Sequence, residues 1–348
     1  MATDHAARLK ALRLQSLFAT RSAAMLGTDA GAKASPKLET IEFALGASGI
    51  DGSIGWVLLT QSAIAGLGPA LLWMRKNELR GVNVIVDDPD VAAVLARRAE
   101  LFELDISVWS VRDNQLVAAA PAVVDARLSA PQEHLKFAPM IEQSGADLVC
   151  EHGVLSGEVL GLEVCRVVDD VVDSAGGRAA RIEIGVGAHD REMFRMVNGL
   201  VVTPESLAKV VNTVRAHRMP GAAKHPLNQL GAERLYREIL IADPQLVGAA
   251  YLNRAEPPVA RANLKDPIPC VLTGVSIGDT TDREVVVACS AIVDADLVTF
   301  AADARLRLSP DAELVIAVAP NNVLPSMQKL AAALRKPARF AEVAQFRS

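Results

Sequence analysis

The chain has 348 residues, of which 51% are hydrophobic and 22% charged, and this composition excludes a chain that is disordered throughout. Its formal net charge is −5, so it lacks the basic balance that usually accompanies binding along a nucleic-acid backbone. The 4 cysteines lie far apart with no Cys-x-x-Cys pair. This spacing fits reduced thiols in a cytoplasmic protein better than a zinc site or a disulfide framework.

Residues 1–38 are predicted to form a basic helix followed by a linker. Basic side chains recur along this segment and meet few acids. Such a run is typical of a solvated helix face. It is also the one place where the chain could hold nucleic acid through a local patch. The side chains that would form this arm are Arg8, Lys10, Arg13 and Arg21.

Residues 52–74 carry no charged side chain and are long enough to cross a bilayer. Polar residues 60–62 interrupt this run, and glycine and proline follow at 66–69. The pattern therefore favours a buried strand, a turn and a core helix, with no membrane partner.

Two segments, 39–120 and 270–348, show the same predicted order of elements. In each, a turn-rich hairpin precedes a helix, a strand, a second helix and a last strand, which is the order ββαβαβ. The sequence FALGASGIDG in the first segment matches CVLTGVSIGD in the second. We interpret the likeness as an internal duplication, and the alternating pattern predicts the α/β class with partly parallel sheets.

The segment 133–253 between them is predicted to be a different, α+β unit. Pro-rich stretches at 119–132 and 254–269 separate it from its neighbours. A helix comes first, then a long β pattern over 146–168 and a further strand over 181–187. Three helices follow, of which the second begins at Pro204 after Thr203, a sound N-terminal signal.

Carboxylates inside two of these strands are the first candidate site. Glu163 and Glu183 are flanked by apolar residues, and a carboxylate there is desolvated unless it is paired, hydrogen-bonded or metal-bound. The order of a helix acid, Glu142, and these two strand acids resembles the restriction-endonuclease-like PD-(D/E)XK nucleases. That resemblance covers about residues 134–197 and implies Mg²⁺ or Mn²⁺ at the acids, acting in phosphodiester cleavage. Gly185 stands where that family has its catalytic lysine.

Imidazole and carboxylate side chains offer a second candidate metal site. His152, His189 and Asp190, with Glu192, are ligand types that suit zinc or iron. The alternative is that the acids at 190 and 192 stabilise the start of a helix by complementing its dipole.

The chain resembles a conserved actinobacterial protein family over most of its length. The resemblance is carried by the segments EHGVLSGEVLGLEV, GVGAHDREMF and AADARL. This resemblance implies a cytosolic housekeeping or regulatory protein and brings no catalytic residues with it. Our leading hypothesis is a non-enzymatic or catalytically degenerate protein that binds a macromolecular partner, most simply another protein. The alternatives are a metal-dependent nuclease or phosphodiesterase that uses the central carboxylates, and a regulator that binds a small molecule.

Overall fold

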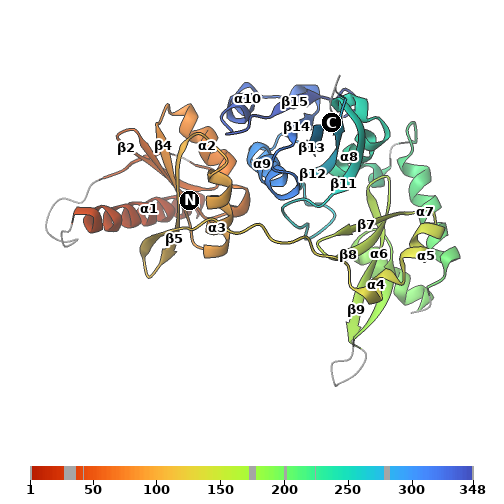
Figure 1. Cartoon of the computed structure of the whole chain (residues 1–348). Coiled ribbons are helices and arrows are strands. Elements are labelled where there is room, and N and C mark those ends of the chain that lie inside the picture. Colours follow the sequence, from red (N-terminus) through yellow and green to blue (C-terminus); the bar gives the residue numbers. More distant parts are fainter. Residues whose placement is uncertain are drawn as a thin grey trace. The chain divides into compact units, whose positions relative to one another are not determined.

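The computed structural model describes residues 2–26, 37–41, 43–171, 178–199, 202–223, 225–277 and 283–346. Most of the predicted N-terminal linker lies outside these residues. The described residues form a mixed α/β structure with three sheets, which confirms the predicted class (Figure 1). Within the same residues, no helix is both long enough and apolar enough to cross a membrane.

The chain divides into two compact units, and its C-terminal part contributes to both. Unit 1 consists of Met1–Val124, Asp294–Leu306 and Val323–Arg339. Unit 2 consists of Asp125–Val293, Arg307–Asn322 and Phe340–Ser348. These units cut the chain differently from the predicted boundaries, which keep residues 270–348 together.

Unit 1 contains a six-stranded sheet whose strands follow one another in chain order: β1 (Glu39–Ile41), β2 (Gly46–Asp51), β3 (Ile54–Leu59), β4 (Gly81–Val86), β5 (Asp105–Arg112) and β6 (Gln115–Ala118). β2 and β3 form an antiparallel hairpin, and β3, β4 and β5 run parallel. The central strands read as nearly continuous apolar runs because helices cover both faces of the sheet.

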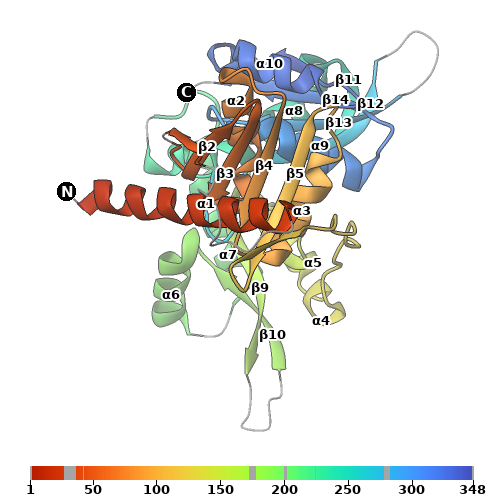
Figure 2. The same ribbon diagram turned by 90° about the vertical axis from the view of Figure 1, so that its left-hand side faces the viewer.

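Helix α1 (Ala2–Leu26) covers one face of this sheet, as Figure 2 shows. Leu14, Leu17 and Phe18 of α1 are buried against strand residues that include Trp56 and Trp109. The rings of Phe18 and Trp56 meet edge to face at 5.1 Å between centroids. The N-terminal helix is therefore part of the core of unit 1.

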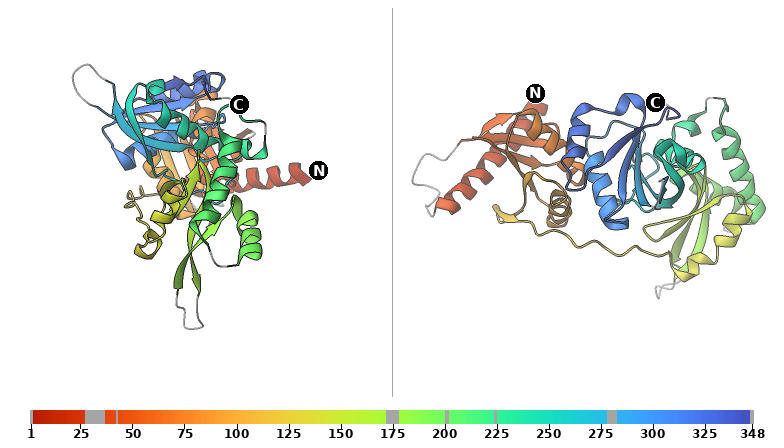
Figure 3. Two further views of the ribbon diagram at one scale, coloured as in Figure 1. Left: turned by 90° about the vertical axis from the view of Figure 1, so that its right-hand side faces the viewer. Right: turned by 45° about the horizontal axis from the view of Figure 1, so that its top comes forward.

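The other α-helices among the described residues of unit 1 are α2 (Leu67–Lys76), α3 (Pro89–Ala99), α9 (Leu297–Leu308) up to Leu306, and α10 (Pro325–Ala332). α2 and α3 pack on β4 and β5, and α10 contacts α2. Figure 3 shows α9 and α10, in blue, beside the orange helices of the N-terminal segment. Asp88 caps α3 by accepting hydrogen bonds from the amides of Asp90 and Val91.

The first sheet of unit 2 is antiparallel, in the order β10-β9-β8-β7. Its strands are β7 (Asp147–Glu151), β8 (Val154–Val159), β9 (Leu162–Val171) and β10 (Arg178–Ile184). The helices that accompany it are α4 (Gln132–Leu135), α5 (Ala138–Gln143), α6 (Gly187–Asn198) and α7 (Pro204–Arg218). Thr203 caps α7 and Pro204 opens it, as predicted.

The second sheet of unit 2 holds β11 (Ala249–Ala255), β12 (Cys270–Ser276), β13 (Arg283–Ser290), β14 (Glu313–Val318) and β15 (Arg339–Glu342), in chain order. β12 and β13 are antiparallel, and β13 and β14 are parallel. Helix α8 (Ala232–Ala242) packs on this sheet. Single-turn helices are Ala63–Ala65, Pro226–Gln229, Pro244–Val247 and Pro320–Asn322.

The order of elements is the same in the two segments where the sequence predicts it. β2-β3-α2-β4-α3-β5 in the first segment corresponds to β12-β13-α9-β14-α10-β15 in the second. Each begins with an antiparallel hairpin whose second strand runs parallel to the next strand. Their origin by duplication stays a prediction.

Candidate functional site

The two predicted strand carboxylates, Glu163 on β9 and Glu183 on β10, meet at a shared arginine of α6. Arg191 Nη1 lies 3.0 Å from Glu163 Oε1, and Arg191 Nε lies 3.3 Å from Glu183 Oε2. β9 and β10 pair in a register that sets Glu183 opposite Arg166. The two acids therefore share one guanidinium.

Each of these acids has a second arginine partner. Arg166 donates from Nε and Nη2 to the two carboxylate oxygens of Glu163, at 2.8 Å each. Arg181 Nη2 lies 2.7 Å from Glu183 Oε1. A bidentate arginine uses the carboxylate oxygens that a hard cation would need. The third predicted acid, Glu142, is exposed on α5.

The imidazole and carboxylate candidates lie on separate elements. His152, in the β7–β8 turn at φ 50°, donates its backbone N–H to Glu256 Oε2 at 2.6 Å. Its Nδ1 lies 3.8 Å from Glu256 Oε1. His189 and Asp190 are exposed in the first turn of α6. Across the described part of the chain, no three His, Cys, Asp or Glu side chains are arranged to hold a metal ion.

The predicted basic arm is partly used inside unit 1. Arg13 pairs with Asp87, and the guanidinium carbon of Arg21 lies 4.0 Å from the ring centroid of Trp109. Arg8 is exposed and Lys10 half-buried. A nucleic-acid contact through the arm would therefore draw chiefly on the first part of α1.

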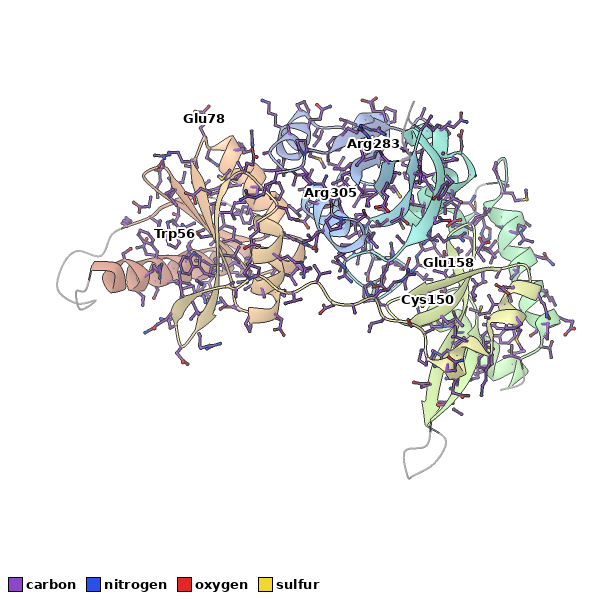
Figure 4. The ribbon with its side chains drawn as sticks, viewed as in Figure 1. Trp56, Glu78, Cys150, Glu158, Arg283 and Arg305 are labelled. Carbon is purple, nitrogen blue, oxygen red and sulfur yellow. The ribbon has the colours of Figure 1, made fainter. Side chains whose placement is uncertain are left out.

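A buried ionic cluster in unit 2 joins α8 to the antiparallel sheet. Arg237 on α8 is fully buried and pairs with Glu158 on β8, which is 1% exposed and is labelled in Figure 4. Arg237 also lies 3.2 Å from Glu151 Oε1, and Arg234 lies 3.3 Å from Glu158 Oε1. Burial alone would raise the pKa of Glu158, but the charges of Arg237 and Arg234 outweigh it and lower that pKa.

Two cysteines of the second sheet extend this cluster. Cys270 on β12 and Cys289 on β13 are cross-strand partners, and both are buried. Arg261 Nη2 donates to Cys270 Sγ at 3.0 Å and Nη1 to Glu151 Oε2 at 2.7 Å. Burial would raise the pKa of Cys270, but its hydrogen bond with Cys289 and the charges of Arg261 and Arg237 lower it to about 7. The same hydrogen bond, together with burial, raises the pKa of Cys289 well above its usual value, so Cys270 is the thiol of the pair that ionises more easily.

A second buried cluster lies in unit 1. Arg97 and Arg98 of α3 both donate to the carboxylate of Asp303 on α9, at 3.0 to 3.1 Å. Arg98 Nη1 also donates to Asp296 Oδ2 at 3.2 Å. Asp296 in turn accepts from the amide of Gly68 on α2 at 2.8 Å. Buried ion pairs thus join α3 to α9 and to Asp296, which directly precedes it.

An apolar groove lies between α6 and α7 in unit 2. Its volume is about 620 Å³, and its wall includes Val186, Phe194, Val210, Val214 and Leu227. Two exposed apolar residues of α6 also line it, Met193 at 46% and Val197 at 76%, and the neighbouring Met196 is 68% exposed. Exposed apolar residues that gather in one patch often mark a site of interaction with another molecule.

None of the protein-family models, curated proteins or solved structures compared with this chain matches it. The candidate sites therefore stand on the geometry of their own residues.

The sequence missed both buried clusters and the groove. Arginine is rarely buried, so Arg237 in the middle of α8 reads as a surface residue. One signal could have been used: Arg234 and Arg237 stand at i and i+3 on the face of α8 that also carries the buried Leu240. A second signal was the run Met193, Met196 and Val197, spaced along one face of a predicted helix.

Proposed function

We propose that the protein works by binding a partner protein, and that the partner lays an amphipathic helix into the groove between α6 and α7. The observation that carries this proposal is the exposure of Met193, Met196 and Val197 beside an apolar groove. Their spacing of three and four residues gives one continuous stripe along α6. Methionine at such a surface adapts its shape to a partner.

The groove has the features of helix-in-groove recognition. Its volume of about 620 Å³ accommodates a few large apolar side chains from one face of a helix. Phe194 and Val210 supply an apolar floor from α6 and α7. A partner helix in the groove would remove both its wall and the exposed α6 stripe from water. Burial of this kind stabilises a complex by roughly 25 cal/mol per Å² of apolar surface.

The charges at the groove select the partner further. Asp190 lines it near the start of α6, and Lys209 lines it from α7. A complementary helix therefore carries an apolar stripe with a basic residue placed for Asp190 and an acidic residue placed for Lys209. Such complementarity contributes more to orientation and specificity than to affinity.

The metal-dependent nuclease receives less support from the same unit. Glu163 and Glu183 hold three arginines, Arg166, Arg181 and Arg191, at ion-pair distance. To take up Mg²⁺, these acids would have to give up charge-assisted hydrogen bonds in a partly buried setting. Binding of a partner needs no such rearrangement.

The test is site-specific photo-crosslinking in cells that make the full chain. A photo-reactive residue at position 196 is compared with one at position 123, because Val123 is 85% exposed in unit 1. We expect a protein adduct at position 196 only, lost in the Val197→Asp variant. The crosslinked segment, made as a peptide, should bind the purified chain as a helix, about tenfold more weakly to Val197→Asp. Equal adducts at both positions, or peptide affinity indifferent to Val197→Asp, would overturn the proposal.

A further inference from the structure

A second cavity in unit 2 lies at the start of α8 and is separate from the α6–α7 groove. Its volume is about 340 Å³. Its walls come from the first turn of α8, from residues 261–267, and from Ala291 and Ile292. The last two residues directly follow β13, which runs parallel to β14. In open α/β sheets, ligands bind outside the carboxyl ends of parallel strands.

The first turn of α8 gives one side of this cavity a positive potential. α8 has 11 residues and begins after Gly231, whose φ of 60° makes it a left-handed N-cap. Gly231 has no side chain that could cap the helix. The amide dipoles of a helix start attract an anionic group.

Two buried arginines add hydrogen-bond donors that the described protein atoms leave unused. The side chains of Arg234 and Arg261 are 10% and 6% exposed, and both line the cavity. Their Nη atoms reach Glu158 and Glu151, yet the Nε of each has no hydrogen-bond partner among the described residues. A buried N–H without an acceptor costs about 1–3 kcal/mol. Both Nε atoms are shielded from solvent, so a ligand in the cavity would meet the charge of the two guanidinium groups and not these N–H groups directly.

The acids in the wall already accept hydrogen bonds from the chain. Glu233 accepts from the amide of Ala291. Asp266 accepts from the amides of Ala262 and Asn263 at 2.7 and 3.0 Å. Lys265, by contrast, is exposed in the wall and adds an ammonium group. Backbone amides thus hold both carboxylates of the wall, while Lys265 and the two arginines supply its cationic groups.

The other side of the cavity is apolar. Leu230, Leu264 and Ile292 line it, and Ile292 is 46% exposed. A ligand that satisfies both sides has an acceptor-rich head and an apolar body.

We propose that this cavity binds a small organic anion, a carboxylate or a phosphate ester. Its anionic head lies against Arg234 and Arg261 at the start of α8. Its apolar body lies against Leu264 and Ile292. This site is independent of the partner groove, and neither proposal requires the other.

The experiment uses the full chain and four probes: phenyl phosphate, benzoate, inorganic phosphate and the neutral benzyl alcohol. Binding is measured by calorimetric titration and by the rise in melting temperature that a native-state ligand causes. We expect phenyl phosphate or benzoate to bind in the millimolar range or tighter and more tightly than inorganic phosphate, with no binding of benzyl alcohol. Which of the two aromatic anions binds better assigns the head group.

Two surface variants test the location without disturbing the buried pairs. Lys265→Glu and Ile292→Asp should each weaken binding of the better aromatic anion about tenfold or more. Lys329→Glu, a reversal at an exposed lysine of α10, serves as the matched control and should leave binding unchanged. Val197→Asp should also leave it unchanged.

Three results would overturn the inference. They are no binding by either aromatic anion, equal binding of benzyl alcohol, and affinities that Lys265→Glu and Lys329→Glu change alike. If inorganic phosphate bound as tightly as phenyl phosphate, the apolar side of the cavity would contribute nothing to affinity, and that part of the proposal would be wrong.

Discussion

Arg237 shows how a single buried charge can organise a unit without adding much net stability. Its guanidinium is shielded from water and faces the carboxylates of Glu158, Glu151 and Glu238. Burying an ion pair costs about as much in desolvation as the attraction returns, so the cluster as a whole contributes little. Removing one partner is different, because it leaves an uncompensated charge in a dry interior.

Glu158→Gln should therefore destabilise unit 2 by about 3–5 kcal/mol. The side chain is 1% exposed, and the loss of its negative charge would leave Arg237 and Arg234 without their shared ion-pair partner. Urea unfolding followed by circular dichroism measures the change. Glu142→Gln, at an exposed residue of α5, is the control and should stay within about 0.5 kcal/mol of the wild type. A loss below 1 kcal/mol for Glu158→Gln would show that water or a neighbouring acid compensates the arginines.

Asp296 gives unit 1 a pH-dependent stability. Burial raises the pKa of Asp296 to about 6, against the charge of Arg98 and the hydrogen bonds from Thr299 and Gly68. The folded state therefore binds this proton more tightly than the unfolded chain, where an aspartate titrates near pH 4. The contribution of Asp296 to the free energy of unfolding is full below about pH 4 and falls as pH rises to about 6.

Between about pH 4 and 6, the free energy of unfolding of the wild type should fall by about 2–3 kcal/mol relative to that of Asp296→Asn. The asparagine keeps an acceptor oxygen but does not titrate. Tryptophan-detected denaturant unfolding at pH 4, 5, 6 and 7 measures the difference between the two proteins. Parallel stability curves for the two proteins would contradict the shifted pKa.

At the residue scale, the sequence placed Glu163 and Glu183 on strands but did not predict their arginine partners. The apolar residues that flank each acid are a local signal, and they sufficed to assign both acids to strands. Arg191 comes from the following helix. Hydrophobic periodicity does not indicate which residues its long side chain contacts. For the same reason the pairing of Arg97 and Arg98 with Asp303, about 200 residues away, could not be predicted.

At the element scale, the order ββαβαβ predicted for residues 39–120 and 270–348 is found in both segments. In the first segment the strand after the hairpin and its helix is β4 (Gly81–Val86), and the second helix is α3 (Pro89–Ala99). Apolar runs and Pro or Gly boundaries fix these elements locally. The pattern of apolar and polar residues does not predict how one helix packs on another. The close approach of α2 at Gly68 to the segment before α9 is an example.

Gly68→Ala should destabilise unit 1 by about 1–3 kcal/mol, although alanine is the better helix former by about 1 kcal/mol. A Cβ at this position of α2 would lie 2.2 Å from the carbonyl oxygen of Ala295, just before α9. The two backbones cannot separate without stretching the hydrogen bond from Gly68 N to Asp296. Thermal unfolding measures the loss, and Lys76→Ala on the exposed end of α2 is the control. A Gly68→Ala protein as stable as that control would mean that α2 and α9 shift apart freely.

At the scale of the whole molecule, the C-terminal segment is shared between the two units. Its strands β13 and β14 belong to unit 2, while the intervening α9, up to Leu306, belongs to unit 1. The predicted boundaries keep residues 39–120 and 270–348 in separate units, since periodicity describes each element but not its neighbours in space. The buried pairs from α3 to Asp303 and Asp296 indicate instead that unit 1 needs residues from both ends of the chain.

Tryptophan fluorescence can test this dependence, because all 3 tryptophans lie in the N-terminal part of unit 1: Trp56, labelled in Figure 4, Trp73 and Trp109. These residues are at most 9% exposed, so native emission reports a folded unit 1. A chain ending at residue 293 lacks α9 and α10, and Arg97 and Arg98 then lose both aspartates. Unpaired buried charges cost about 3–5 kcal/mol, a large part of the stability of a domain.

We therefore expect the truncated chain to emit at the longer wavelength of solvent-exposed indole and to show no cooperative transition in urea. The full-length Asp303→Asn variant removes one carboxylate without shortening the chain, and it should keep native emission but unfold at lower urea concentration. If the truncated chain instead kept native emission and a cooperative transition, residues 39–120 with α1 would fold alone. The aspartates of α9 would then be a later addition to a self-sufficient unit, and Asp303→Asn should leave the tryptophan transition where it is in the wild type.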